Sequence, residues 1–162
     1  MKIFDCFMYF DEEVILDLRL NILNDYVDYF VIVESTFTHR GDKRKLKFNR
    51  EKFKKFEKKI VYLVYNENPP KIEEVFHKDS NDEKSRKYIL NAAHRENGQR
   101  DYLTNGLQNA DDDDLILISD VDEIPNLQNL DKKNINNKII LFKQDMFYYK
   151  FNLKLPDLIW TG

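Results

Sequence analysis

The chain of 162 residues has a single cysteine, Cys6, and no apolar run long enough to span a bilayer. One cysteine excludes a disulfide framework within the chain, and its place in an apolar segment predicts a buried thiol. The missing run excludes a transmembrane helix, which needs about 18 apolar residues or more. The N-terminus starts directly with a strand-like run and lacks the layout of a signal peptide, so we expect a cytoplasmic protein.

A strong net charge, an internal repeat and a flexible interdomain linker are also missing. The net charge of −3 does not favour nucleic acid or an anionic membrane as a partner. Basic runs at 43–47 and 52–59 are interpreted as solvated faces. The chain does hold 42% hydrophobic and 14% aromatic residues, which predicts a packed core within one domain of residues 1–162.

Short apolar runs alternate with helical patterns along the chain. Apolar runs predict strands, and segments with apolar residues at helical spacing predict helices. The expected strands are 2–9, 29–33, 60–65 and 115–119, and the expected helices are 12–24, 49–59 and 85–107. This alternation predicts an α/β fold with a mainly parallel sheet flanked by helices on both faces.

The connections and the last part of the chain are less regular. Polar residues at 66–84 predict a mobile loop, and the four acids at 111–114 predict a solvated connector. One helical turn is expected at 126–130. Two later runs, 138–142 and 146–153, predict a pair of adjacent antiparallel strands.

The most informative segment is 115–125, where an aliphatic strand stops at Asp120, Asp122 and Glu123. Alternate side chains of an extended segment share a face, so Asp120 and Asp122 are expected to point into one crevice at the carboxyl end of the strand. Two converging carboxylates repel each other unless a cation or a proton lies between them. Their oxygens suit Mg²⁺ or Mn²⁺, which bridge to substrate phosphates. The segment predicts a metal–diphosphate site, with a solvated strand-end turn as the alternative.

Three segments of the chain resemble glycosyltransferase family 17. They are Asp5-Cys-Phe-Met-Tyr-Phe-Asp-Glu12, Val31-Ile-Val-Glu-Ser-Thr-Phe-Thr-His39 and Ile118-Ser-Asp-Val-Asp-Glu-Ile-Pro125. Arg19-Leu-Asn-Ile-Leu23 and Arg95-Glu-Asn-Gly-Gln-Arg-Asp101 match as well. The matches follow the expected order over nearly the whole chain, so they are far more specific than a lone Asp-x-Asp.

The resemblance implies a GT-A type, Rossmann-like fold and a nucleotide-sugar donor, which is UDP-GlcNAc in typical members. It also implies a saccharide or glycoconjugate acceptor, inversion at the anomeric carbon, and Mn²⁺ or Mg²⁺ as the metal. The family usually continues past the Trp160-Thr-Gly162 position. Part of the C-terminal acceptor region is therefore expected to be missing from this chain. The identity of the acceptor and the oligomeric state are not predicted.

The resemblance assigns roles to the acids of the turn. Asp122, by its match to the last acid of the family's Asp-x-Asp, is expected to bind the metal directly. Asp120 is expected to contact the ribose, or the metal through water. Glu123 is expected either to bind sugar hydroxyls or, equally, to cap the turn that follows, since Pro125 suits an early helical position.

Two arginines of the expected helix 85–107 are candidates for the donor phosphates, because a guanidinium can bind phosphate oxygens in a bidentate manner. Arg100 matches the family's Gln-Arg pair and is the first candidate, and Arg95 is the second. The alternative for Arg100 is an ion pair with Glu96, which lies four residues earlier on the same helix face.

Further candidates lie at other strand ends. Asp11 follows the first strand and is expected to bind the base or ribose, unless it only caps the next helix. Glu34 ends the second strand and is expected to bind ribose or base, unless it is a surface acid. An inverting transferase also needs a general base, and Asp145 is the candidate.

Two other functions compete with a transferase. A phosphatase of the haloacid dehalogenase type also places Asp-x-Asp after an apolar strand. It usually has Thr or Val two residues after the second acid, where this chain has Ile124, and its motif lies near the N-terminus. The other alternative is a non-catalytic remnant that binds a nucleotide sugar or a carbohydrate.

Overall fold

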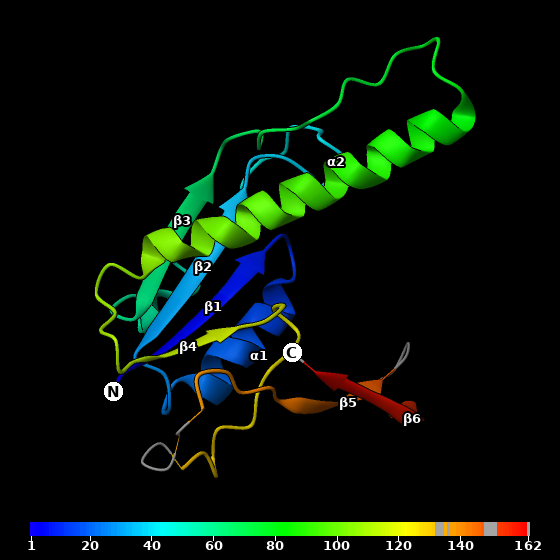
Figure 1. Cartoon of the computed structure of the whole chain (residues 1–162). Helices are drawn as coiled ribbons and strands as arrows, with labels where there is room; N and C mark the ends of the chain where they lie inside the picture. The colour runs from blue at the N-terminus through cyan, green and yellow to red at the C-terminus, as the bar shows by residue number, and fades with distance from the viewer. Residues whose placement is uncertain (132–134, 136, 148–151, 162) are drawn as a thin grey trace.

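The computed structural model describes residues 1–131, 135, 137–147 and 152–161, the last five by their backbone only. Its centre is a parallel sheet in the order β3-β2-β1-β4 (Figure 1). The strands are β1 (Ile3–Tyr9), β2 (Tyr29–Ser35), β3 (Ile60–Tyr65) and β4 (Leu115–Ile118). Helix α1 (Glu13–Leu23) lies on one face and helix α2 (Asn81–Asp101) on the other. The predicted α/β fold with a parallel sheet is confirmed.

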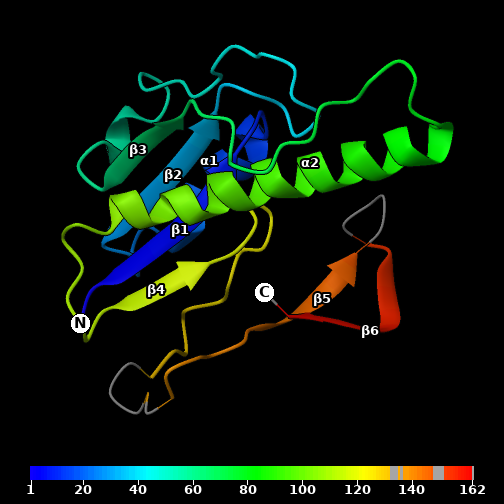
Figure 2. The same cartoon turned by 45° about the horizontal axis from the view of Figure 1, so that its top comes forward.

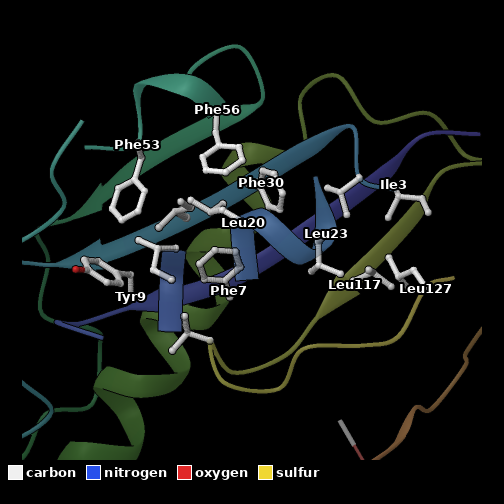
Figure 3. Packing of buried hydrophobic residues seen from close by; sticks show 14 residues of the cluster. Ile3, Phe7, Tyr9, Leu20, Leu23, Phe30, Phe53, Phe56, Leu117 and Leu127 are labelled. Carbon is white, nitrogen blue, oxygen red and sulfur yellow. The ribbon is translucent and has the colours of Figure 1, made fainter. Parts of the chain in front are cut away.

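Strand β1 is central because its side chains are buried on both faces. Ile3 and Phe7 join the core on the α1 side, whereas Phe4 and Cys6 join the core on the α2 side. A nearly continuous apolar run is typical of a parallel strand covered on both faces. Figure 3 shows the α1-side core, in which Ile3 and Phe7 lie close to Leu23 of the helix. The buried Cys6 thiol confirms the prediction for this residue.

Helix α2 begins earlier than the sequence predicts. Ser80 accepts a hydrogen bond from the Glu83 N–H at 3.2 Å and so provides the N-cap, and the helix begins at Asn81, four residues before the expected start. The helix ends at Asp101 and continues as the 3₁₀ segment η2 (Tyr102–Gly106). Gly98 is required inside the helix, because a Cβ there would lie 2.5 Å from the hydroxyl oxygen of Tyr65 on β3.

The polar segment before α2 is tied to the helix along its length. Asn91 donates to the Glu73 carbonyl at 2.7 Å and accepts from the Glu73 N–H at 2.8 Å. Lys87 forms an ion pair with Asp79 at 2.7 Å. Figure 2 shows this segment running beside the half of α2 that projects beyond the sheet. The loop predicted for 66–84 therefore ends at the cap of α2, and its backbone is anchored.

The acidic connector 111–114 was predicted to be solvated, and the structure confirms this for Asp111, Asp112 and Asp113, which are exposed. Asp114 is the exception, with a side chain 2% exposed. Its carboxylate accepts hydrogen bonds from the N–H of Lys2 at 2.5 Å and of Asp111 at 2.9 Å, which join the start of β1 to the start of β4. These two N–H groups hold the pKa of Asp114 below its usual value.

The helix predicted for 49–59 is wrong, because the segment forms only the 3₁₀ turn η1 (Lys54–Phe56). Phe53 and Phe56 are buried, and a single turn is enough to bring both onto the core. The lysines around them are exposed, so no second apolar row favours a longer helix.

Of the helical turn predicted for 126–130, only a single hydrogen-bonded turn is present, in which the Leu130 N–H donates to the Leu127 carbonyl at 3.1 Å. Asn126 uses its side-chain oxygen to accept from the Gln128 N–H at 3.1 Å, and such local bonds compete with helix formation. The antiparallel pair is present, but as β5 (Lys143–Phe147) and β6 (Lys154–Thr161), later than predicted. The apolar run 138–142 instead lines a cleft beside β4. Within the described ranges, no helix combines the length and apolar character needed to cross a bilayer.

Candidate functional site

The strand order reverses between β1 and β4. From β1 the chain builds β2 and β3 on one side of the sheet, and α2 then returns it to the other side, where β4 pairs with β1 (Figure 1). Ligands of open α/β sheets bind outside the carboxyl ends of the strands at such a reversal. Asp11 follows β1 and the acidic turn, residues 120–123, follows β4. The topology thus brings two predicted parts of the site to one edge.

The acidic turn reverses the chain directly after β4. Glu123 N–H donates to the Asp120 carbonyl at 3.0 Å and Ile124 N–H donates to the Asp122 carbonyl at 3.1 Å. The strand therefore ends at Ile118, and the alternation of side chains ends with it. The predicted convergence of Asp120 and Asp122 depended on that alternation. Buried Val121 anchors the turn, and the Asp122 carboxylate is exposed, without a hydrogen bond to any described residue.

Glu123 stabilises the turn from within. Its carboxylate accepts a hydrogen bond from the Asp120 N–H at 2.9 Å. This bond closes the turn backwards, onto a residue before Glu123, whereas the capping alternative placed the side chain over the turn that follows. The sugar contact that the other alternative assigns to Glu123 stays a prediction.

Arg100 links α2 to the acidic turn. Its Nη2 atom donates to Asp120 Oδ1 at 3.1 Å and to Glu96 Oε1 at 3.2 Å, so the expected helix pair forms and the guanidinium still reaches the turn. The Arg100 side chain is 34% exposed. No other nitrogen of this guanidinium donates to a described residue, which leaves N–H groups for phosphate oxygens.

Arg95 lies elsewhere. It donates to the His39 carbonyl at 3.1 Å and to the Asn68 side chain at 3.3 Å. His39 lies in the loop after β2, and Asn68 lies in the loop after β3. Gly41, at φ 102°, packs against it so closely that a Cβ would lie 2.6 Å from a guanidinium nitrogen. Arg95 and Arg100 therefore have different partners, and within the described residues no hydrogen bond joins Arg95 to the acidic turn, so this geometry does not support the phosphate contact predicted for Arg95.

Glu34 is a buried structural acid, not the surface acid of the alternative. Its side chain is 0% exposed and pairs with Arg44 at 3.0 Å. It also accepts from the N–H groups of Lys47 and Phe48 and from the Tyr62 hydroxyl, at 2.6, 3.1 and 2.7 Å. Burial and this last bond raise the pKa of Tyr62. A contact between Glu34 and ribose, as predicted, would require breaking these bonds, so the geometry argues against it.

Asp11 is exposed at the edge of the site. The carboxylate of Glu12, not of Asp11, accepts the N–H groups of Phe10 and Asp11, each at 3.0 Å. The Asp11 carboxylate therefore does not cap α1. Burial, together with the charges of Glu34, Glu13, Glu12 and Asp11, raises the pKa of the Tyr9 hydroxyl to about 12, so it stays protonated at neutral pH.

Asp145 lies in the separate hairpin. Its carboxylate pairs across β5 and β6 with Lys154 at 2.7 Å, and its side chain is 59% exposed. The role of general base stays a prediction for this residue.

A cleft of about 880 Å³ runs along the open edge of β4. Ser119 and Glu123 line it beside the acidic turn, and residues 137–142 form the opposite wall. Its volume is within the range of about 300–1,000 Å³ that small-molecule sites occupy.

Asp5 and Arg19, which were given no role from the sequence, support the acidic turn. Arg19 bonds both the Asp5 carboxylate and the Asp120 carbonyl. The Asp5 and Arg19 side chains are 0% exposed, and they pair at 2.7 Å. The signal was present in the sequence, since Asp5 interrupts an apolar strand. Arg19 shares the buried stripe of α1 with Leu16 and Leu23. A charge in each of two apolar patterns indicates a buried pair.

The model of Glycosyltransferase family 17 matches residues 1–162 of this chain. The chain belongs to glycosyltransferase family 17. Two relatives, both named β-1,4-mannosyl-glycoprotein 4-β-N-acetylglucosaminyltransferase, come from Homo sapiens and Rattus norvegicus, and each is 31% identical over 125 residues. The alignment covers 68% of this family 17 chain and 19% of each relative, so the chain spans about a fifth of their length. No solved structure matches it.

Two exposed carboxylates of this family 17 chain, Asp120 and Asp122, are available as oxygen ligands for a divalent cation. Across the described ranges, no three His, Cys, Asp or Glu side chains are arranged to hold a metal ion. Mg²⁺, however, is commonly held by one or two carboxylates while water and substrate phosphates complete its shell. Asp122 is exposed, and only Oδ1 of Asp120 is bonded to Arg100, so both can offer oxygen ligands.

Proposed function

We propose that this family 17 chain is an inverting glycosyltransferase. It moves a sugar, GlcNAc by the names of its relatives, from a UDP-sugar to a saccharide or glycoconjugate acceptor, with Mn²⁺ or Mg²⁺ bound. One observation carries the proposal. Arg100 and two exposed carboxylates, Asp120 and Asp122, lie together at the point where the strand order reverses.

The chemistry requires a diphosphate to leave as an acceptor hydroxyl attacks the anomeric carbon. A bound divalent cation supplies Lewis-acid stabilisation of the negative charge that develops on the leaving diphosphate. Asp122 and Asp120 are the residues that hold this cation. Arg100 contributes a second, fixed positive charge and donates to the phosphate oxygens.

The remaining roles follow from position. Asp11, at the carboxyl end of the neighbouring strand, contacts the ribose or base of the donor. The cleft beside β4 is the place for the sugar, with Glu123 and Ser119 on its wall. The acceptor hydroxyl loses its proton to a general base as the new glycosidic bond forms and the bond to the diphosphate breaks.

The test is UDP release from UDP-GlcNAc in the presence of Mn²⁺ and a saccharide acceptor. We expect slow release by the intact chain and loss of release in Asp122→Asn. Asp82→Asn, which removes an exposed acid from the first turn of α2, is the matched control and should leave the rate unchanged.

Three results would contradict the proposal. If calorimetry with Mn²⁺ detects no UDP binding, the chain is not a UDP-sugar transferase. If it binds UDP and never turns over a donor, it is a binding remnant. Hydrolysis of p-nitrophenyl phosphate, lost in Asp120→Asn, would instead indicate a phosphatase.

A further inference from the structure

The guanidinium of Arg19 is fully buried and is bonded to groups inside the protein. Its Nε and Nη2 atoms donate to the two carboxylate oxygens of Asp5 at 2.8 and 2.7 Å, and its guanidinium lies 4.5 Å from the centre of the Phe7 ring. The guanidinium thereby connects α1 with β1. Because both members of the pair are fully buried, this arrangement is held in one geometry.

The remaining donors of Arg19 hold the backbone of the acidic turn. Nη1 donates to the carbonyls of Asp120, Val121 and Glu123 at 2.7, 3.1 and 3.2 Å. Nη2 donates to the Ser119 hydroxyl at 2.7 Å, and that hydroxyl donates in turn to the Glu123 carbonyl at 3.1 Å. Three carbonyl oxygens that converge on one point repel each other unless a cation lies among them. The shape of the turn therefore depends on this guanidinium.

The carbonyls of the turn face inward to Arg19, whereas Asp120 and Asp122 are exposed. Asp5 balances the charge of Arg19, so the pair holds the turn without adding net charge beside these acids. Groups that orient metal ligands in this way affect metal affinity although they never touch the metal.

We propose that Arg19, backed by Asp5, is a positioning residue that fixes the acidic turn so that Asp120 and Asp122 are presented to a divalent cation and the donor diphosphate. The inference rests on the proposed function for the identity of the ligand. The positioning itself rests on the contacts within this chain.

The experiment uses variants chosen to stay folded. Replacing a buried ion pair by apolar side chains of similar size is often neutral for stability, so Asp5→Leu is combined with Arg19→Met. Ser119→Ala is the milder variant, since it removes one bond to Arg19 and one to the turn. The matched control replaces another largely buried pair, far along α2, by Lys87→Met with Asp79→Leu.

Two quantities are measured on folded protein without donor. Electron paramagnetic resonance of free Mn²⁺ gives the affinity for the metal alone, and hydrogen exchange gives the protection of the Glu123 and Ile124 amides, which are bonded within the turn. We expect the pair variant to bind Mn²⁺ about 10–100-fold more weakly and Ser119→Ala several-fold more weakly. Both should exchange these two amides faster, while the amides of β2 and β3 keep their protection. The control should change neither quantity.

Unchanged Mn²⁺ affinity and unchanged exchange in the folded pair variant would overturn the proposal. If that variant does not fold, Ser119→Ala decides by the same two measurements. If the wild-type chain itself binds no Mn²⁺, the metal part of the proposed function fails. Amide exchange then decides alone, because faster exchange at the turn supports the positioning role and unchanged exchange refutes it.

Discussion

Arg100 Nη2 lies 3.1 Å from Asp120 Oδ1, so a helix on one face of the sheet contacts the turn at the carboxyl end of β4. Both side chains are partly exposed, and an exposed ion pair contributes only about 0–1 kcal/mol to stability. The pair therefore has little value as a structural link. It does bring a cation to the acids that a diphosphate would approach.

Replacing Arg100 by Gln should weaken donor binding without unfolding the protein. A charged hydrogen bond to a ligand contributes about 1.5–3 kcal/mol, which corresponds to a loss of about 10–100-fold in UDP affinity. Calorimetry with Mn²⁺ measures the affinity, and urea unfolding should show a change below about 1 kcal/mol. Arg95→Gln is the control, since Arg95 binds the loops after β2 and β3. Equal losses of affinity in both variants would contradict this assignment.

Replacing Glu34 by Gln should destabilise the fold. Arg44, whose side chain is 9% exposed, would lose its charged partner, and breaking a buried pair costs about 3–5 kcal/mol. Urea unfolding measures the change in the free energy of unfolding. Tyr62→Phe removes only the hydroxyl bonded to Glu34 and should cost about 1 kcal/mol. A stable Glu34→Gln protein that no longer binds UDP would instead support the contact with ribose that the sequence predicted for Glu34.

Replacing Gly98 by Ala should lower stability, although Ala is the better helix former by about 1 kcal/mol. The added Cβ would lie 2.5 Å from the Tyr65 hydroxyl oxygen and force β3 and α2 apart. We expect a net loss of about 1–3 kcal/mol by urea unfolding. Tyr65→Phe removes the clashing oxygen, so the double variant should recover part of the loss. Additive effects of the two substitutions would show that this contact is not the cause.

Stability should fall as the pH drops below about 4, the ordinary pKa of an aspartate. Backbone N–H groups of Asp111 and Lys2 lower the pKa of Asp114, and the hydrogen bond from Lys87 lowers the pKa of Asp79. A lowered native pKa means that the unfolded chain takes up its proton first. The stabilisation is therefore complete above the unfolded pKa and is lost as the pH falls through the native pKa.

Urea midpoints measured from neutral to acidic pH check this direction. Asp114→Asn should lower stability at pH 7 and flatten the acid slope. Asp112→Asn, in the exposed part of the same connector, should leave the slope as it is. An unchanged acid slope in Asp114→Asn would contradict the role of this carboxylate.

The central strands were predictable because their residues are apolar on both faces. The bounds of β1, β3 and β4 agree with the sequence within one residue. Burial of polar groups was not predictable in the same way. Glu34 was assigned to a ligand because nothing in its neighbours shows that Arg44 and Tyr62, which are distant in the sequence, meet it inside the protein.

Turn chemistry explains the other differences. Asp120 and Asp122 were expected to alternate as in a strand, but Glu123 closes a turn on the Asp120 N–H and ends the alternation. In the same way, Asn126 uses its side chain to bond a nearby amide, and only one hydrogen-bonded turn, from Leu127 to Leu130, follows. Arg19 was recognised only as part of a family match, because its partners are carbonyl oxygens that no residue pattern reveals.

The lone thiol provides a probe of motion in the sheet. Cys6 is 1% exposed beneath η2, and burial raises its pKa to about 12, so the reactive thiolate is scarce in the closed protein. Because the chain has no second thiol, every molecule modified by a thiol reagent has exposed Cys6 at least once. The rate of labelling therefore measures how often the segments that cover β1 open.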